Sequence, residues 1–292
     1  MTHNLITRIA SKTRTVEISR DRPTTIIGER INPTGRKKLY DALAERNFEL
    51  VRQDALNQVA AGATVLDVNA GIDEADEPTL LQEVMRVVTG VTDVPLCIDT
   101  SDPKALSAAL SIYEGKALVN SVNGEERSLK EMLPLVKEHG AAVVGLCMDE
   151  DGIPETPEKR LAVAAKIIER AGKLGIELSD VVIDPLVLTI GTDSVAGYIT
   201  LETAARVVKA FGVNITMGAS NVSFGLPDRP YVNSAFMAMA IQAGLTCPIT
   251  NPLATEMMTA ILAADLVMGR DEDSMRWIKA YRDRQKAARN EP

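Results

Sequence analysis

Residues 64–71 read TVLDVNAG, a short apolar run that ends in Asp67 and Asn69. Short runs rich in valine, isoleucine and leucine, separated by helical stretches, are typical of βαβ units around a buried parallel sheet. The chain repeats this form, with each run closing on a carboxylate or an amide, in TTIIGERIN (24–32), PLCIDTS (95–101), ALVNSVNG (117–124), AVVGLCMDE (142–150), DVVIDP (180–185) and NITMGASNVS (214–223). We therefore predict an α/β fold, a (β/α)₈ or TIM barrel in which these runs are strands.

Apolar residues at helical spacing fill the gaps between the runs. In the segment 157–174, Thr156 precedes Pro157, which is a good signal for a helix start. Its apolar stripe consists of Leu161, Ala164, Ala165, Ile168, Ala171 and Leu174. Similar stripes predict helices around 41–61, 79–89, 103–111, 126–139, 201–211, 232–243 and 254–264.

The remaining segments complete the predicted architecture. An eighth strand is expected at Leu245 to Ile249, although Pro248 cannot donate a ladder hydrogen bond. The N-terminal extension contains a short strand in TRTVEIS (13–19), and a charged C-terminal helix over 271–289 should pack on the barrel's outside. That helix would turn inward Met275, Trp277, Ile278 and Tyr281. We expect one domain spanning 1–292, with the barrel over about 24–266 and a long irregular loop at 186–201 that carries substrate contacts.

Composition excludes several classes of function. The net charge of −8 and the 3% aromatic content argue against a nucleic-acid partner, because phosphate contacts need cations and single strands need stacking platforms. No apolar stretch is long enough to span a membrane. We expect a cytoplasmic protein.

Cysteine and histidine are too sparse for the common metal and catalytic sites. Cys97, Cys147 and Cys247 are far apart, and the only histidines are His3 and His139. Neither a zinc site nor a disulfide framework is expected, and the thiols in strand-like runs should be buried. A phosphate-binding GxxxxGK[ST] loop and a GxSxG nucleophile are also absent from the sequence.

The polar residues that close the runs are the best indication of function, because active sites of such barrels gather where strands end. Carboxylates and amides can together bind the donors and acceptors of a flat, nitrogen-rich heterocycle. Octahedral magnesium is the alternative ligand for such a ring. The ring comprises Glu29, Asn32, Asp67, Asn69, Asp99, Asn120, Asn123, Asp184, Ser220 and Asn221.

Six motifs in order resemble the pterin-binding methyltransferases, specifically the methyltetrahydrofolate:corrinoid methyltransferases. They are IIGERIN, VLDVNAG, CIDTS, LVNSVN, VVIDPL and ASNVSFGLPDRPYVN, and the resemblance runs from about Thr24 to Leu266. It implies a TIM barrel, usually homodimeric, that moves a methyl group between N5 of methyltetrahydrofolate and the cobalt of a separate corrinoid protein. The chain itself would bind no metal.

The resemblance also assigns roles to individual residues. Asp99, Asn120 and Asp184 match positions that anchor the pterin, and Asn221 matches the asparagine that hydrogen-bonds near N5. Ser220 and Arg229 match further ligand-side positions, with Arg229 facing the benzoyl-glutamate end of the folate. Phe224 departs from the pattern, because corrinoid methyltransferases often carry a polar residue there.

The implied chemistry fits the residues present. A tertiary amine leaves poorly until N5 gains positive charge, and no histidine is placed to donate a proton. The proton would come from solvent, while Asn221 stabilises the charge that develops at N5. The cobalt belongs to the partner, and this sequence has no DxHxxG cobalamin signature.

Two other functions are compatible with the same barrel. A dihydropteroate synthase would share the pterin pocket, but that family carries a lysine where this chain reads GASNVS. A folate-binding protein without chemistry is the second alternative. The direction of methyl transfer, the identity of the corrinoid partner and the primary methyl donor are not encoded in any motif.

Overall fold

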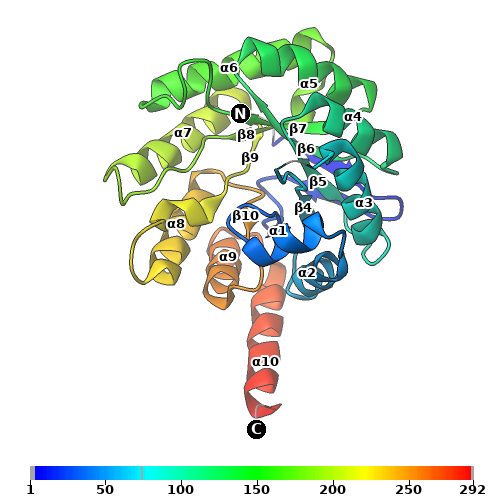
Figure 1. The fold of residues 1–292 in the computed structure, drawn as a ribbon. Coiled ribbons are helices and arrows are strands. Elements are labelled where there is room, and N and C mark those ends of the chain that lie inside the picture. Colours follow the sequence, from blue (N-terminus) through cyan, green and yellow to red (C-terminus); the bar gives the residue numbers. More distant parts are fainter. Residues whose placement is uncertain (1–3, 74, 291–292) are drawn as a thin grey trace.

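The computed structural model describes residues 4–73 and 75–290, and its centre is a barrel of eight parallel strands (Figure 1). The strands are hydrogen-bonded in the order β10-β3-β4-β5-β6-β7-β8-β9. Parallel bridges Ile215–Leu245 and Gly218–Ile249 join the two ends of this sheet and close the barrel. The strands are β3 (Ile27–Ile31), β4 (Val65–Val68), β5 (Leu96–Asp99), β6 (Leu118–Asn123), β7 (Ala142–Leu146), β8 (Val181–Asp184), β9 (Asn214–Ile215) and β10 (Ile249–Thr250).

Helices follow the strands and form the outer ring that Figure 1 shows. A large apolar cluster fills the space between the ring and the barrel, as expected for βαβ units whose sheet is buried on both faces. The helices are α1 (Lys37–Ala44), α2 (Glu49–Ala60), α3 (Glu77–Thr89), α4 (Pro103–Ile112), α5 (Glu126–Glu138), α6 (Pro157–Lys173), α7 (Ala196–Phe211), α8 (Arg229–Ala243), α9 (Thr255–Val267) and α10 (Met275–Asn290), with short 3₁₀ turns η1 (Leu178–Asp180), η2 (Ala219–Ser223) and η3 (Glu272–Ser274).

An N-terminal hairpin closes the end of the barrel where the strands begin. It consists of β1 (Thr7–Ala10) and β2 (Thr15–Ile18), which pair antiparallel. Ile9 and Ile18 are fully buried and share one apolar cluster with barrel residues, including Ile27, Val65 and Leu118. The predicted leading strand was thus correct, but its partner β1 was not anticipated.

The last two strands are shorter than their sequences suggest. Instead of a strand over Leu245–Ile249, the structure has one bridge at Leu245 and then β10 at Ile249–Thr250. Pro248 lies between them and contributes only its carbonyl, which accepts from the N–H of Ile27. Likewise β9 ends at Ile215, and the segment ASNVS is a 3₁₀ turn rather than strand.

Several helix boundaries also differ from the sequence pattern. The stripe over 41–61 is two helices, because the chain turns at Arg46, whose φ is +57°. Helix α7 begins at Ala196, so the last third of the expected loop at 186–201 is helical. In α6 Ala164 and Ala171 of the predicted stripe are buried, but the rest of the buried face consists of Arg160, Val163 and Ile167, and Leu174 is exposed.

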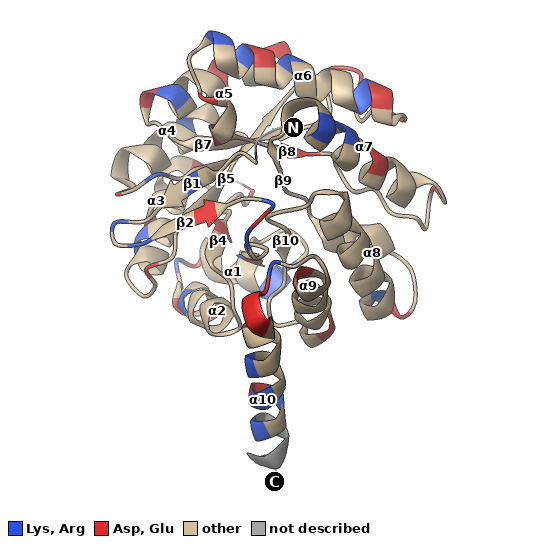
Figure 2. Ribbon diagram, turned by 180° about the vertical axis from the view of Figure 1, so that it is seen from behind, with Lys and Arg blue, Asp and Glu red and all other residues tan. Residues whose placement is uncertain are grey.

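The C-terminal helix does not pack along the barrel as expected. Figure 1 shows α10 projecting away from the ring; of the four residues predicted to face inward, Trp277 and Ile278 are half-buried, whereas Met275 and Tyr281 are 62% and 54% exposed. Its base is held by Arg276, whose guanidinium pairs with the buried Asp265 at 2.9 Å. Residues 275–286 contain five lysines and arginines and one aspartate, visible along α10 in Figure 2, so most of this helix favours water.

Candidate functional site

Five polar side chains form one layer on the inner face of the barrel, which we call the inner polar layer. Each lies two residues after a member of the apolar cluster inside the barrel, and residues two apart in a strand point to the same face. The polar layer therefore stands directly above the apolar one, at the carboxyl ends of the strands. Its members are Glu29 after Ile27, Asp67 after Val65, Asp99 after Cys97, Asn120 after Leu118 and Asp184 after Val182.

Hydrogen bonds join part of this layer. The Asn120 Nδ2 group of β6 donates to Asp67 Oδ1 of β4 at 3.1 Å, and β5 lies between these two strands. The Asn32 Nδ2 group donates to Asp99 Oδ2, also at 3.1 Å. The side-chain oxygen of Asn120 accepts no hydrogen bond from another described residue and is free for a ligand donor. Both amides are thus oriented by carboxylates.

Burial raises the pKa of the carboxyl groups in the layer. Desolvation lifts the pKa of Asp99 to about 6, and it lifts that of Asp67 well above its usual range, with the nearby charge of Asp99 adding to the effect. Two buried carboxylates in contact cannot both ionise cheaply. The pair therefore shares one proton, which Asp67 keeps while Asp99 is the more acidic member.

Asp184 and Glu29 are similarly perturbed. Burial raises the pKa of Asp184 to about 7, opposed by a hydrogen bond from the Leu186 N–H (2.7 Å) and by the charge of Arg160. Burial also raises the pKa of Glu29 to about 6, against the charges of Arg30 and Arg229. Such values place the layer's change of charge near neutral pH, where acid–base groups of active sites operate.

The turn η2 carries Ser220 and Asn221 at the carboxyl end of β9. The amide nitrogen of Asn221 lies close over Gly218, where an added Cβ would come within 3.2 Å of it. Within the described residues, neither the Asn221 amide nor the Ser220 hydroxyl makes a side-chain hydrogen bond to the protein. Asn221 is also exposed, so its amide is available to a molecule in the barrel mouth.

Arg229 braces this turn. Its Nη2 donates to the Ser220 carbonyl at 2.9 Å and its Nε to Ser223 Oγ at 3.0 Å. The Ser223 hydroxyl in turn donates to Asn233 Oδ1 of α8. The guanidinium also lies 5.7 Å from the ring centre of Phe224, which is 68% exposed. Arg229 therefore holds the loop that presents Asn221, and two of its donors are already used.

Two further members of the predicted ring form hydrogen bonds within their own loops. The Asn69 side-chain oxygen accepts from the Gly71 N–H at 2.8 Å, and that of Asn123 accepts from the Glu125 N–H at 2.9 Å. These are local turn-forming bonds of the kind that asparagine commonly makes. Asn123 is thus a loop-forming residue, whereas Asn69 also makes a side-chain hydrogen bond to Asp99 of the inner polar layer.

The structure also reports on other kinds of site. In the described ranges, no group of three or more His, Cys, Asp and Glu side chains is arranged to hold a metal ion. Cys97, Cys147 and Cys247 are free cysteines and all three are buried, as was predicted for Cys97 and Cys147. Of the helices that the structure describes, none has the length and apolarity to cross a bilayer.

Sequence comparisons identify the family. Residues 28–251 match the model of the family described as pterin binding enzyme. The chain belongs to the pterin-binding enzymes. A methylcorrinoid:tetrahydrofolate methyltransferase of Eubacterium limosum is 33% identical over 88% of this chain and 96% of its own length. The methionine synthase of Mycobacterium tuberculosis is 30% identical over 83% of this chain, which matches only 22% of that longer protein.

Solved structures share the fold of this pterin-binding enzyme. A dihydropteroate synthase from Xanthomonas albilineans aligns with a TM-score of 0.69 at 19% identity, covering 89% of this chain and 98% of that one. A dihydropteroate synthase from Thermus thermophilus aligns with a TM-score of 0.65 at 21% identity, covering 89% and 99%. At this identity the likeness concerns the barrel alone.

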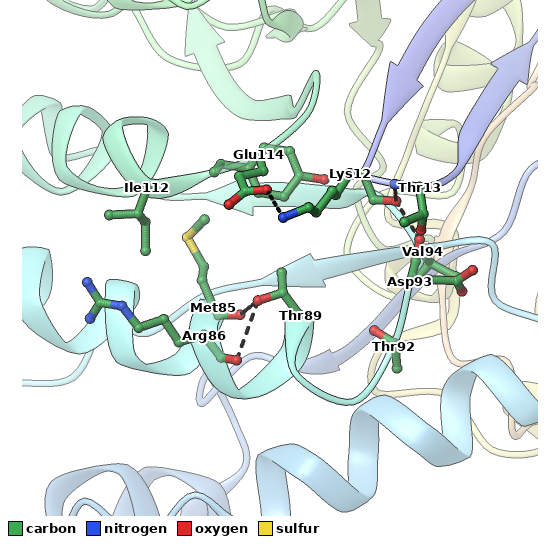
Figure 3. Close-up of a pocket in the computed structure, with 12 residues that line it drawn as sticks. Lys12, Thr13, Met85, Arg86, Thr89, Thr92, Asp93, Val94, Ile112 and Glu114 are labelled. Atoms are coloured by element: carbon green, nitrogen blue, oxygen red, sulfur yellow. Dashed lines mark hydrogen bonds and ion pairs between the residues drawn. The ribbon is translucent and has the colours of Figure 1, made fainter.

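A separate cavity of about 410 Å³ lies at the opposite end of the barrel, between the β1–β2 turn and the ends of α3 and α4 (Figure 3). Its wall includes the ion pair between Lys12 and Glu114 at 2.6 Å. Tyr113 also lines it and uses its hydroxyl within the protein, donating to the Ala10 carbonyl and accepting from the Leu96 N–H. None of the inner polar layer reaches this cavity.

Sequence reasoning missed Arg160 in the helix after β7. This side chain is 1% exposed and binds the loop that follows Asp184. A signal existed, since Arg160 lies at helical spacing from Ala164, Ile167 and Ala171, all buried. An arginine on the apolar face of a helix needs buried partners.

Proposed function

We propose that this chain is a methyltransferase that moves a methyl group between N5 of 5-methyltetrahydrofolate and the cobalt of a separate corrinoid protein. One observation carries the proposal: the inner polar layer and the free amide of Asn221, which follows β9, lie at the same end of the barrel. The likeness to the methylcorrinoid:tetrahydrofolate methyltransferase supports the same activity. The same groups serve both directions of methyl transfer, because the forward and reverse reactions pass through the same transition state.

The inner polar layer suits the hydrogen-bonding edge of a pterin. That edge presents N–H donors beside ring acceptors, so it needs carboxylate acceptors and an amide that does both. We assign Asp99, Asn120 and Asp184 to this edge. Support comes from their common layer and from the free oxygen of Asn120. Asp67 accepts a hydrogen bond from the Asn120 amide and would hold that amide in its orientation.

Asn221 would act at N5. When cobalt(I) attacks the methyl carbon, the C–N bond breaks and its electron pair stays on N5, so N5 must first carry a proton. The Asn221 oxygen can accept a hydrogen bond from this protonated N5 and so stabilise the charge. In the reverse reaction the N5 lone pair attacks the methyl carbon and the N5 proton is then lost to solvent. Ser220 lies beside this centre, and Arg229 holds its loop.

The corrinoid protein would dock at the mouth. Three large apolar residues are exposed there, each following a different strand end: Leu188 after β8, Phe224 after η2 and Leu253 after β10. An apolar rim suits a protein partner that must approach closely and exclude water. In this account Phe224, the residue that departs from the family pattern, contributes to docking.

We further propose a homodimer through α8. After Arg229 this helix contains no charged residue, as Figure 2 shows, and Tyr231 and Met239 are exposed on it, with Tyr198 exposed on the adjacent α7. Uncharged faces of this kind are typical of subunit contacts. Light scattering of Met239→Arg tests it: the variant should be a monomer. A wild-type monomer would refute the dimer.

We also place the protein in the cytoplasm, a compartment in which free thiols such as its three cysteines persist.

The decisive test of function is direct. The purified protein is mixed with cob(I)alamin and 5-methyltetrahydrofolate, and the cobalt absorbance is followed. We expect conversion to methylcobalamin that depends on the protein, and the reverse change from methylcobalamin and tetrahydrofolate. No change in either direction, while the protein still binds folate by calorimetry, would leave a folate-binding protein without this chemistry.

A further inference from the structure

Arg160 is a buried cation without a carboxylate in contact. It extends from the first turn of α6 and is 1% exposed. No carboxylate oxygen of the described residues lies within ion-pair distance of its guanidinium. A buried charge in this situation is costly unless its hydrogen bonds and its surroundings compensate. Its position therefore calls for an explanation.

The guanidinium bonds three backbone carbonyls. Its Nε donates to Pro154 at 2.8 Å, and its Nη1 donates to both Pro185 and Leu186 at 2.8 Å. Pro185 and Leu186 directly follow Asp184 at the end of β8. The Leu186 carbonyl also accepts from the Thr200 hydroxyl at 2.9 Å, so α6 and α7 grip the same peptide unit.

These hydrogen bonds fix Leu186 in an unusual backbone conformation. Leu186 has φ of +65°, a left-handed conformation that a leucine adopts only when its surroundings impose it. In that conformation its N–H donates to Asp184 Oδ1 at 2.7 Å. The contacts of Arg160 thus lead through one residue to the carboxyl group of the inner polar layer.

Arg160 also acts on Asp184 through its positive charge. The groups that face Asp184 from the elements around it are Arg160 on α6, Cys147 after β7 and Cys247 before β10. Both thiols are buried and neutral, because burial raises the pKa of each. Arg160 is therefore the one cation among these neighbours, and it favours the ionised form of Asp184.

We propose that Arg160 is a positioning residue for the pterin-binding carboxylate Asp184: it fixes the Leu186 backbone whose N–H orients Asp184, and its charge favours the ionised form of that carboxylate. This inference rests on the proposed function only for the identity of the ligand. Asp184 would otherwise be protonated over more of the neutral range, and a protonated carboxyl cannot accept both pterin donors.

Three variants test it, all compared with Ile167→Val, a core change on the same face of α6. Arg160→Met removes the charge and all three bonds, whereas Arg160→Lys keeps the charge but cannot bridge the carbonyls. Arg160→Gln serves if Arg160→Met does not fold. The Asp184 carboxyl is followed by ¹³C NMR titration of the apoprotein, with its signal assigned by its absence in Asp184→Asn.

We expect the Asp184 midpoint to lie near 7 in the wild type and to move upward in Arg160→Met or Arg160→Gln. In Arg160→Lys it should stay near the wild-type value. By calorimetry at pH 7.5, Arg160→Met should bind 5-methyltetrahydrofolate at least tenfold more weakly, about 1.4 kcal/mol. It should cause no further loss when added to Asp184→Asn, because Arg160 would act through that residue.

The outcomes separate the two proposals. An unchanged midpoint in folded Arg160→Met, or an affinity loss that adds fully to that of Asp184→Asn, would overturn the role of Arg160. If the wild type bound no folate, the proposed function would fail, while the apoprotein titration would still decide whether Arg160 controls Asp184.

Discussion

The two ends of this barrel are built from the same strands yet differ in almost every physical respect. At the closed end, Ile9 and Ile18 of the hairpin complete an apolar layer with Ile27, Val65 and Leu118. Two residues further along the strands, the side chains at the mouth are carboxylates and amides that are buried without full compensation. The closed end gains stability from burial, whereas the mouth loses stability to hold groups ready for a ligand. Substitutions at the closed end should therefore lower stability, whereas substitutions at the mouth should lower folate binding or catalysis.

The closed end should control stability alone. Ile18→Ala removes a fully buried side chain from the hairpin, so we expect it to lower the free energy of unfolding by about 2–5 kcal/mol. Folate affinity of the folded variant should not change. Denaturant unfolding and calorimetry measure the two quantities, with Ile18→Val as the milder control. A loss of folate affinity without a loss of stability would break the comparison.

The mouth should control chemistry. Asn221→Ala should slow methyl transfer by about 10²–10³-fold, the usual effect of deleting one preorganised group at a developing charge. Folate affinity should fall much less. Asn123→Ala is the matched control, since that amide bonds only its own loop. Stopped-flow rates equal to those of the wild type would remove Asn221 from the catalytic assignment.

Binding should depend on the inner polar layer. Asp99→Ala leaves ligand donors unpaired and should weaken folate binding by about 1–3 kcal/mol. Asp180→Ala is the control at the closed end, where its carboxylate pairs with Lys116 at 2.6 Å. Calorimetry should show a loss for Asp99→Ala only. Equal affinities for the two variants would refute the placement of the pterin.

The smallest effect concerns pH. Because the pKa of Asp184 rises from 3.8 to about 7 on folding, the native state binds more protons than the unfolded state between these values. Stability of the apoprotein should therefore fall as pH rises through this window. Asp184→Asn should flatten the slope and be more stable than the wild type at pH 8. Identical thermal-unfolding slopes for the two proteins would contradict the buried state of Asp184.

Much of this architecture follows from the sequence, because apolar runs and helical stripes report which surfaces are buried. The residues two apart, such as Val65 and Asp67, reveal both the strand and its polar end. Where the pattern failed, backbone conformation decided: Arg46 breaks a stripe at a left-handed turn, and Pro248 shortens the last strand. The predicted packing of α10 on the barrel was wrong because the large apolar residues of this helix occupy only its first turns.

The site was only partly predictable. Strand ends indicate which side chains converge, so the ring of ten polar residues could be predicted, and the family resemblance then selected Asp99, Asn120 and Asp184 among them. Local patterns do not show which amide bonds its own loop, as Asn123 does, and which remains free, as Asn221 does. Nor do they show partners from other elements. The contact of Asp67 with Asn120 and the reach of Arg160 to Leu186 depend on the closed barrel.

A crystal structure of the protein soaked with 5-methyltetrahydrofolate tests the central claim most directly. We predict the pterin in the mouth, with its hydrogen-bonding edge on Asp99, Asn120 and Asp184 and its N5 within hydrogen-bond distance of the Asn221 amide. A pterin bound elsewhere, for example in the cavity beside Lys12 and Glu114, or one in the mouth with these side chains turned away, would contradict it.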